Sequence, residues 1–182
     1  MQALFAPRRI ALIGASTDAS RLTARAQLYL RRHGFTGDLF PVNPRAAEVL
    51  GEPAYARLAD VPGAIDLAYI LVGTEHVEQA VADCAARGVP VACILADGFA
   101  EAGPAGVALQ ARLLATARAG GMRLLGPNSM GIINLPARIA CSVNAALEAE
   151  DLLPGRWSVV SQSGSIMGTL LSRAAARGFG FA

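Results

Sequence analysis

The chain has 182 residues, a length that suits one α/β domain and part of another. Hydrophobic residues make up 53% and aromatic residues only 5%, so we expect a core of Ala, Val, Leu and Ile around a buried parallel sheet. The net charge is +2, and the 16 basic residues, all arginine, form no basic stripe, which argues against a nucleic-acid-binding protein.

The first strand is predicted at residues 9–14, an apolar run that ends in a glycine. A helix follows, because apolar side chains recur on one helical face at Leu22, Ala26, Tyr29 and Leu30. Gly34 ends this helix, and residues 38–43 form the second strand, closed by the proline that follows. A short helix and a loop are expected from there to Gly63.

Strands and helices continue to alternate as far as residue 126. Further strands are predicted at residues 66–72, 89–95 and 122–126. Helices are predicted at residues 75–87, with Gly88 as the residue after the cap, and around residues 109–117. This alternation predicts βαβ units, and therefore a Rossmann-like, doubly wound parallel sheet.

The pattern breaks after Leu125, and we expect an irregular stretch from there to residue 155. The predicted domains are residues 1–150 and residues 151–182, the latter with a strand at 157–161 and a helix at 163–177. One strand and one helix cannot bury a core. We therefore expect sequence outside this chain to complete a second α/β domain.

The loop after the first strand is a candidate phosphate site, because a doubly wound sheet binds nucleotides there. A dinucleotide fingerprint has its second and third glycines where this chain has Ser16 and Ala19, which argues against an NAD site. Backbone N–H groups of the helix start and hydroxyls of Ser16, Thr17 or Ser20 could still hold a phosphate. The alternative is that Ser20 or Asp18 only caps the helix.

The end of the second strand points to a ribose that carries a phosphate. An NAD site expects an acid there, but the sequence has Asn43, Pro44 and Arg45. A guanidinium binds a phosphate through two hydrogen bonds, which suits NADP and coenzyme A (CoA) alike. The alternative is a solvated arginine in a turn.

Eight short motifs occur in order along the chain. They are residues 4–7 (LFAP), 13–16 (IGAS), 34–37 (GFTG), 41–44 (PVNP), 98–101 (GFAE), 125–128 (LGPN), 131–134 (GIIN) and 161–164 (SQSG). Together they resemble the N-terminal part of the NDP-forming acyl-CoA synthetases, which include the ADP-forming acetate–CoA ligases and are related to the succinyl-CoA synthetase α subunit. The resemblance covers essentially the whole chain.

The resemblance implies an acid–CoA ligase, which forms an acyl-CoA from a small carboxylic acid, CoA and a nucleoside triphosphate through acyl phosphate and phosphohistidine intermediates. ATP or ADP with Mg would bind an ATP-grasp domain or subunit, and the protein would be an oligomer. The resemblance also implies that the second domain is flavodoxin-like and related to succinyl-CoA ligase. His33 and His76 do not match the phosphohistidine, which is expected downstream, so this chain would hold no catalytic residue and be inactive alone.

The resemblance further implies that CoA lies across the carboxyl ends of the strands. The expected contacts are Gly14, Ala15, Ser16, Thr17, Arg21, Val42, Asn43, Pro44, Arg45, Val72, Gly73, Ala96, Gly98, Phe99 and Asn128. Relatives often have lysine at position 21 and Val-Pro-Ala from position 72, so the chain departs from the family there.

A second anion site is implied at the start of the last helix. There Ser163, Gly164 and Ser165 would face the phosphorylated histidine, because free N–H groups and the helix dipole favour a phosphate. An ordinary capped helix start is the alternative. A hydrolase elbow is improbable, because it needs glycines two residues either side of the serine, where this chain has Ser161 and Ser165.

Two other function classes remain open on the sequence, a non-catalytic CoA-binding or regulatory module and an NADP-binding oxidoreductase domain. Asp97 and Glu101 are interpreted as loop-forming or substrate-adjacent, and no metal site is expected. The start lacks the features of a signal peptide, and the apolar runs are too short to span a bilayer. Three scattered cysteines favour a reducing cytoplasm.

Overall fold

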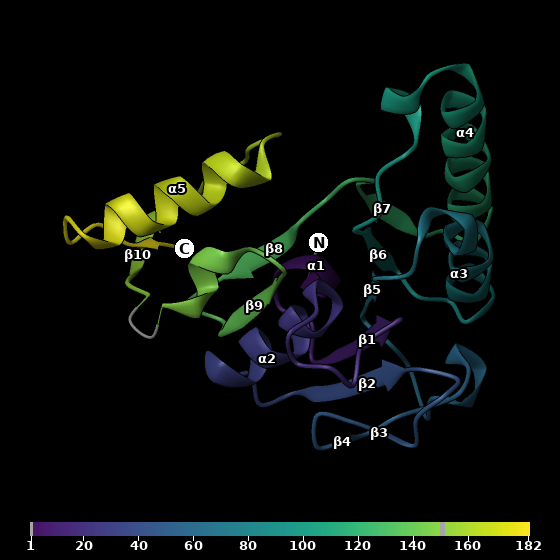
Figure 1. Ribbon diagram of the computed structural model, residues 1–182, viewed down its shortest axis with the longest axis horizontal. Helices are drawn as coiled ribbons and strands as arrows, with labels where there is room; N and C mark the ends of the chain where they lie inside the picture. The colour runs from purple at the N-terminus through teal and green to yellow at the C-terminus, as the bar shows by residue number, and fades with distance from the viewer. Residues whose placement is uncertain (1, 150–151) are drawn as a thin grey trace.

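The computed structural model describes residues 2–149 and 152–182. Its centre is a parallel sheet of five strands in the order β2-β1-β5-β6-β7 (Figure 1). The strands are β1 (Arg9–Ile13), β2 (Asp38–Val42), β5 (Leu67–Ile70), β6 (Val91–Ile94) and β7 (Arg123–Leu125). The predicted Rossmann-like, doubly wound α/β fold is confirmed, with each of the five strands within about two residues of its expected place.

Strand residues alternate between two buried faces. Ala11, Ile13, Ala68 and Ile70 face one cluster, which α3 (Thr74–Ala86) and α4 (Pro104–Ala119) cover. The intervening residues, among them Ile10, Leu12, Leu67 and Tyr69, face the other cluster. That face is covered by α2 (Arg25–Arg32), which follows a 3₁₀ turn, η1 (Leu22–Ala24). Helices on both faces explain why the strands are apolar throughout.

A β-hairpin completes the cover beside α2, where the sequence predicted an irregular stretch. Strands β8 (Gly131–Asn134) and β9 (Ile139–Ser142) pair antiparallel, and Ile139 and Cys141 join the core under the sheet (Figure 1). The prediction was wrong because neither strand alternates apolar and polar residues, and no helix separates the two as in a βαβ unit. The four residues between them are nevertheless a hairpin spacing. A 3₁₀ turn, η4 (Ala145–Glu148), follows.

The segment between β2 and β5 also differs from its prediction. The expected short helix is a small antiparallel ribbon of β3 (Glu48–Val49) and β4 (Glu52–Pro53), followed by a 3₁₀ turn, η2 (Leu58–Asp60). Leu50 and Gly51 between the two strands both have positive φ, which is the geometry of a tight hairpin turn. The sequence analysis missed this turn because Leu-Gly lacks the Asn or Asp that usually precedes the glycine of such a turn.

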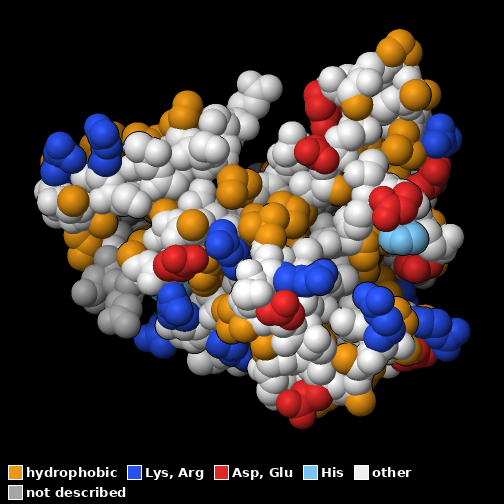
Figure 2. Space-filling model, in the orientation of Figure 1, with side chains coloured by type: hydrophobic (Ala, Val, Ile, Leu, Met, Phe, Trp, Pro, Cys, Tyr) orange, Lys and Arg blue, Asp and Glu red, His pale blue; other side chains and the backbone are white. Residues whose placement is uncertain are grey.

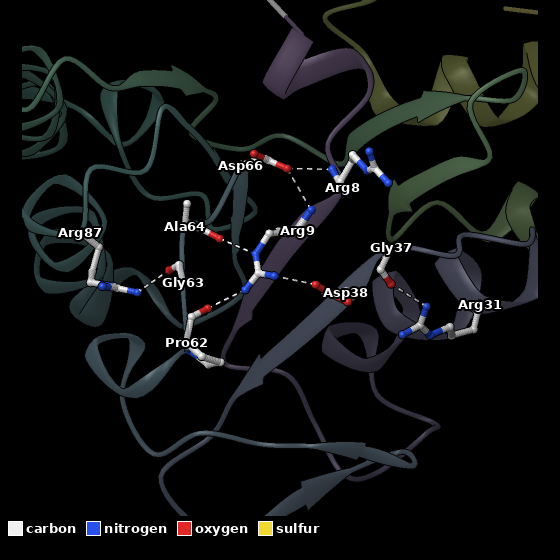
Figure 3. A network of polar contacts seen from close by, with 10 residues as sticks. All are labelled: Arg8, Arg9, Arg31, Gly37, Asp38, Pro62, Gly63, Ala64, Asp66 and Arg87. Carbon is white, nitrogen blue, oxygen red and sulfur yellow. Dashed lines mark hydrogen bonds and ion pairs between the residues drawn. The ribbon is translucent and has the colours of Figure 1, made fainter.

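Guanidinium groups hold the loops at the amino edge of the sheet (Figure 3). Arg9 donates to the carbonyl oxygens of Ala64 and Pro62, at 2.6 Å each, and pairs with Asp38 at 2.7 Å. Arg87 donates to the carbonyl oxygens of Val61 and Gly63 at 2.7 and 2.8 Å. The loop before β5 is thus fixed by side chains from β1 and from the end of α3.

The remaining elements are short ones before β1 and α4, and a strand and a helix near the end of the chain. A single helical turn, α1 (Gln2–Phe5), precedes β1, and η3 (Ala100–Ala102) precedes α4. At the other end, α5 (Gly164–Ala175) follows β10 (Pro154–Trp157), whose only bridges among the described residues are to Phe181. The strand was predicted at 157–161 but lies earlier, because Phe181 pairs with Pro154 and Trp157. Residues 150 and 151, at the predicted domain boundary, lie outside the described residues.

The contact between α4 and the loop after β6 depends on a glycine. Gly106 is buried in the first turns of α4, and a Cβ there would overlap the backbone carbonyl of Phe99. We expect Gly106→Ala to lower the free energy of unfolding by about 2 kcal/mol, because overpacking against backbone outweighs the gain of about 1 kcal/mol in helix propensity. Denaturant titration measures this.

The matched control is Ala108→Gly on the exposed side of the same helix, which should cost only the propensity difference of about 1 kcal/mol. A stabilised Gly106→Ala variant would show that α4 does not pack this closely on Phe99.

Candidate functional site

The residues predicted to contact a ligand lie along the carboxyl edge of the sheet. All five strands run parallel, so the loops that follow them leave from the same edge. Backbone hydrogen bonds continue the sheet into these loops: Gly14 N–H donates to Val42 at 2.9 Å, and Asn128 N–H donates to Ala96 at 2.8 Å. Residues predicted from the sequence in five separate segments therefore lie along one edge.

The winding of the sheet reverses at β1 and β5. The helix after β1, α2, covers one face of the sheet, whereas the helix after β5, α3, covers the other, so the winding reverses between these neighbouring strands. Ligands of doubly wound sheets bind at such a point. Here Gly14 has φ 90°, and a Cβ on it would stand 2.7 Å from Cγ1 of Val72. Gly14 therefore lets the backbones of the two strand ends approach.

The loop after β1 is closed by its own side chains. Ser16 Oγ accepts the N–H of Asp18 at 3.0 Å, and Asp18 Oδ1 accepts the hydroxyl and the N–H of Ser20 at 2.6 and 2.9 Å. These hydrogen bonds from Ser20 lower the pKa of Asp18. Arg21 Nε lies 3.7 Å from the same carboxylate. The loop is thus preorganised, with an exposed guanidinium beside it.

The helix after this loop begins later than the phosphate argument assumed. The 3₁₀ turn η1 comes first, with Arg21 as its N-cap and no side-chain cap, and α2 starts only at Arg25. Neither Asp18 nor Ser20 caps a helix, so that alternative is wrong. The groups nearest the strand end are the backbone and hydroxyls of the loop itself, with Thr17 exposed and Ser16 half-buried.

Asn43 links the loops after β1 and β2. Its Nδ2 donates to the carbonyl of Ala15 at 3.0 Å, while its Oδ1 accepts the N–H of Arg45 at 2.9 Å. Its own N–H donates to Tyr55 at 2.9 Å. Arg45 is held at the rim by its backbone while its side chain is exposed. An aspartate, which a dinucleotide site would favour here, could not donate to Ala15.

The loop after β6 is fixed by Thr74 and Glu101. Thr74 Oγ1 donates to the carbonyl of Asp97 at 2.8 Å, and Glu101 Oε1 accepts the N–H of Gly98 at 2.8 Å. Backbone N–H groups, foremost those of Glu101 itself and Phe99, lower the pKa of this carboxyl. Glu101 is therefore loop-forming, one of the two interpretations made from the sequence.

The structure corrects the expected contact at Phe99. The whole residue is buried in the cluster under α3 and α4, so Phe99 supports the loop from below and presents no surface to the edge. Ala96 and Gly98 are half-buried, and Asn128 is exposed with φ 55°. Ala15 and Val42 are also buried: Ala15 has no exposed surface, and its carbonyl accepts the Asn43 hydrogen bond.

Glu75 is a site residue that the sequence analysis missed. Both of its carboxylate oxygens lie 2.7 Å from where a Cβ of Gly73 would stand, so the carboxylate covers the end of β5. His76 lies 3.7 Å away and is exposed. The available signal was an acid three residues after the last residue of the expected strand, in the first turn of a helix. It brings negative charge to the carboxyl edge of the sheet.

His33 and the start of α5 have structural contacts. His33 Nε2 lies 2.8 Å from the carbonyl oxygen of Leu147, at the end of α2. Ser163 Oγ accepts the N–H of Ile166 at 3.3 Å and is the N-cap of α5, so this helix has an ordinary capped start. Asn144 Nδ2 donates to the carbonyl of Gly164 at 2.9 Å, which docks α5 on the hairpin.

Neither membrane nor metal features emerge within residues 2–149 and 152–182. No helix there combines the length and the apolar character that crossing a bilayer requires. No three His, Cys, Asp or Glu side chains there are grouped so as to hold a metal ion.

Comparison with known proteins identifies the domain. A family model described as a CoA binding domain matches residues 8–134. The chain belongs to this family. It is 34% identical over 170 residues to the ADP-forming acetate–CoA ligase I subunit alpha of Pyrococcus furiosus, a match that covers 91% of this chain and 36% of that protein. The chain thus spans about a third of that relative's length.

Solved structures agree with this placement. The apo form of the dinucleotide-forming acetyl-coenzyme A synthetase 1 of Ca. Korarchaeum cryptofilum superposes with a TM-score of 0.92 at 34% identity, over 99% of this chain and 38% of that one. The ADP-forming acetate–CoA ligase I of Archaeoglobus fulgidus is 34% identical over 181 residues, which are 26% of its length. The resemblance to NDP-forming acyl-CoA synthetases is therefore confirmed.

The link made by Asn43 can be tested by a change of one atom. Asn43→Asp keeps the acceptor for Arg45 but replaces the donor to Ala15 with a charged oxygen. We expect the free energy of unfolding at pH 7 to fall by about 1–3 kcal/mol, because a carbonyl loses its partner and faces like charge. Below pH about 4 the protonated acid regains a donor, so the deficit should shrink.

Asn128→Asp, the same change at an exposed position of the edge, is the control and should be close to neutral. Denaturant titrations at pH 7 and pH 4 measure both. Equal stability of the two variants at pH 7 would contradict the link.

Proposed function

We propose that the carboxyl edge of this sheet binds CoA, and that the chain is the CoA-binding part of an NDP-forming acid–CoA ligase. The observation that carries the proposal is the link between the loops after β1 and β2, where Asn43 joins the Gly14 loop to the exposed Arg45. Membership of the CoA binding domain family supports the ligand. The ligase names of the relatives support the reaction class.

Each group of the edge has a distinct part in this proposal. The backbone of Gly14, the hydroxyls of Ser16 and Thr17, and Arg21 meet the pyrophosphate, and the buried Ala15 supports this loop from below. Val42, Asn43 and Pro44 flank the adenosine, and the guanidinium of Arg45 pairs with the phosphate on its ribose. Pantetheine runs past Val72 and Gly73 to Ala96 and Gly98, which the buried Phe99 supports, with the thiol near Asn128.

In the proposed reaction, a small carboxylic acid, CoA and a nucleoside triphosphate give an acyl-CoA, a nucleoside diphosphate and phosphate. The acid is first activated as an acyl phosphate, and a phosphohistidine carries the phosphoryl group. The histidine and the ATP-grasp part, with ATP and Mg, belong to sequence or a subunit beyond these residues. This chain orients the thiol, and alone it would bind CoA without turnover.

The start of α5 takes the phosphohistidine in this proposal. Ser163, Gly164 and Ser165 form the start of α5, where the helix dipole favours a phosphate. The N–H of Ser163 donates to Ser161 Oγ at 3.1 Å, so the N–H groups of Gly164 and Ser165 are the proposed donors. Met130, two residues after Asn128, packs against Gly164, which brings this helix start near the loop after β7. The two predicted sites would then adjoin, as transfer of an acyl group to the thiol requires.

The proposed division into residues 1–150 and 151–182 is supported by surface composition. Trp157 is 67% exposed and Val160 fully exposed, and Ile166 and Phe179 are also exposed on β10, α5 and their surroundings. Figure 2 shows hydrophobic side chains at the surface of this region. A second α/β domain would bury such side chains.

We further propose an oligomeric, cytoplasmic enzyme. Cys84, Cys93 and Cys141 are free, buried thiols, as a reducing compartment would keep them.

Calorimetric titration with CoA and with dephospho-CoA tests the ligand. We expect CoA to bind about 10-fold or more tightly than dephospho-CoA, because only CoA offers the phosphate that Arg45 would hold. Arg45→Gln should remove this preference. Arg118→Gln, exposed near the end of α4, should retain it.

Failure to bind either ligand would overturn the proposal, and equal affinity for both would remove Arg45 from it. Saturable quenching of NADPH fluorescence, with no binding of CoA, would favour the oxidoreductase alternative instead.

Glu75 is expected to weaken CoA binding, because its carboxylate covers the end of β5 where an anionic ligand approaches. Glu75→Gln should tighten binding by about 3- to 10-fold at low salt, an effect of about 1 kcal/mol for charges near a surface, and the gain should fade in high salt. Glu78→Gln is the control, because Glu78 lies one turn further along α3 and pairs with Arg112 at 2.7 Å. Equal gains for both variants would exclude a local effect of Glu75.

A further inference from the structure

The opposite edge of the sheet has a cavity that the proposed function does not use. It lies where β2 begins, about 220 Å³ in volume, at the other end of the strands from the CoA edge. Three segments line it: residues 6–8 before β1, residues 34–37 between α2 and β2, and residues 137–139 in the β8–β9 hairpin. Two of the motifs noted in the sequence, at residues 4–7 and 34–37, therefore meet here rather than at the CoA edge.

Close backbone contacts assemble this cavity. Asn134 Nδ2 donates to the carbonyl of Phe5 at 2.8 Å, and Asp38 N–H donates to the carbonyl of Arg8 at 2.9 Å. A Cβ on Gly37 would collide with the same carbonyl of Arg8. The three segments thus form a fixed frame, and the cavity between them is a built feature of the fold.

Two charged residues line the cavity, Arg8 and Arg138, and no acid among residues 2–149 and 152–182 lines it. The acids close by are engaged elsewhere: Asp66 accepts the N–H groups of Arg8 and Arg9 at 2.8 and 3.0 Å, and Asp38 pairs with Arg9 at 2.7 Å. Figure 3 shows the Arg8 guanidinium directed away from Asp66, toward the hairpin strands. The cavity therefore carries positive charge that no lining carboxylate balances.

Arg31 removes competing acceptors from the turn. Its Nη1 donates to the carbonyl of Gly37 at 3.0 Å (Figure 3) and to that of Phe35 at 2.9 Å. Its guanidinium also pairs with Glu52. Carbonyls that would otherwise attract the lining arginines are already satisfied. Arg8 and Arg138 thus remain available to an oxyanion.

Arg138 is held in an unusual backbone conformation. Its φ is 57°, in the left-handed region that favours glycine, and its side chain lies across Gly34, with Cδ and Nη1 3.4 and 3.5 Å from where a Cβ would stand. Glycine at position 138 would meet the turn geometry without strain. This conformation and the contact with Gly34 place the Arg138 side chain at the wall of the cavity.

We propose that this cavity is a second ligand site, which holds the phosphoryl group of a small phosphate-bearing molecule between Arg8 and Arg138. Guanidinium groups bind phosphate oxygens in pairs, and two of them match a dianion. The volume is below the roughly 300–1,000 Å³ of pockets for drug-sized ligands, which restricts the occupant to a small phosphate ester or phosphate itself. The site is separate from the one proposed for CoA.

Inorganic phosphate and glycerol phosphate are the probes, with protein amide resonances followed by NMR in the presence of saturating CoA. CoA then occupies the carboxyl edge, and saturable shifts are expected at residues 34–37 and 137–139. Arg138→Gly should weaken phosphate binding by about 10-fold or more while the protein stays folded, because glycine fits this φ. Arg8→Gln should do the same, and Arg118→Gln should bind as the parent does.

Three results would overturn the proposal: no saturable shift at these residues, equal binding by the arginine variants and the parent, or tighter binding of malonate than of phosphate. The arginine variants locate the site even in protein that does not bind CoA. Failure of this proposal is therefore distinguishable from failure of the function proposed above.

Discussion

The close approach of the β1 and β5 strand ends is the constraint on which the candidate site depends. Gly14 carries no side chain, so Val72 packs where its Cβ would stand, and the two backbones meet at the point where the winding of the sheet reverses. Any larger residue at position 14 would push β5 aside and move the loops on both sides. Asn43 then ties the β2 loop to the β1 loop, and Thr74 ties the start of α3 to the β6 loop. The edge is therefore a set of linked loops on a rigid sheet, which suits a long, extended ligand.

The hairpin β8–β9 gives the fold its other distinctive property. It fills the face beside α2 where a further helix would otherwise pack, and Ile139, Cys141 and Val143 bury against β1 and β5 through the shared core. Asn144, directly after this hairpin segment, holds the carbonyl of Gly164. The same segment thus completes the first domain and positions α5.

The main elements could be predicted from the sequence because their local signals agree with the final packing. Apolar runs, helical spacing in α3 and the glycine after its cap all reflect the same buried sheet, and Gly88 indeed has φ 65°. The family resemblance located the edge residues in five segments, and parallel topology brings them together. Their roles remain proposals, since a resemblance carries positions rather than contacts.

What the sequence did not reveal depends on tertiary contacts between distant residues. Phe99 sits in a motif next to the edge, yet its ring turns into the core because α4 approaches it at Gly106. The hairpin strands show no apolar–polar alternation, and only their packing on the face beside α2 distinguishes them from a loop. Glu75 folds back over Gly73, and no periodicity in α3 indicates this. The late start of α2 follows from the hydrogen bonds within the Asp18 turn, which occupy residues that a typical fingerprint would give to the helix.

The arginines that bind loop carbonyls at the amino edge should make this part of the fold insensitive to salt. Arg9, Arg31 and Arg87 each donate to two backbone carbonyls of a loop, at 2.6 to 3.0 Å. Dipolar acceptors of this kind are far less subject to ionic screening than carboxylates, and a lysine could not span two of them in one plane. The loops at the amino ends of the strands should therefore keep their geometry at salt concentrations that screen ordinary surface ion pairs.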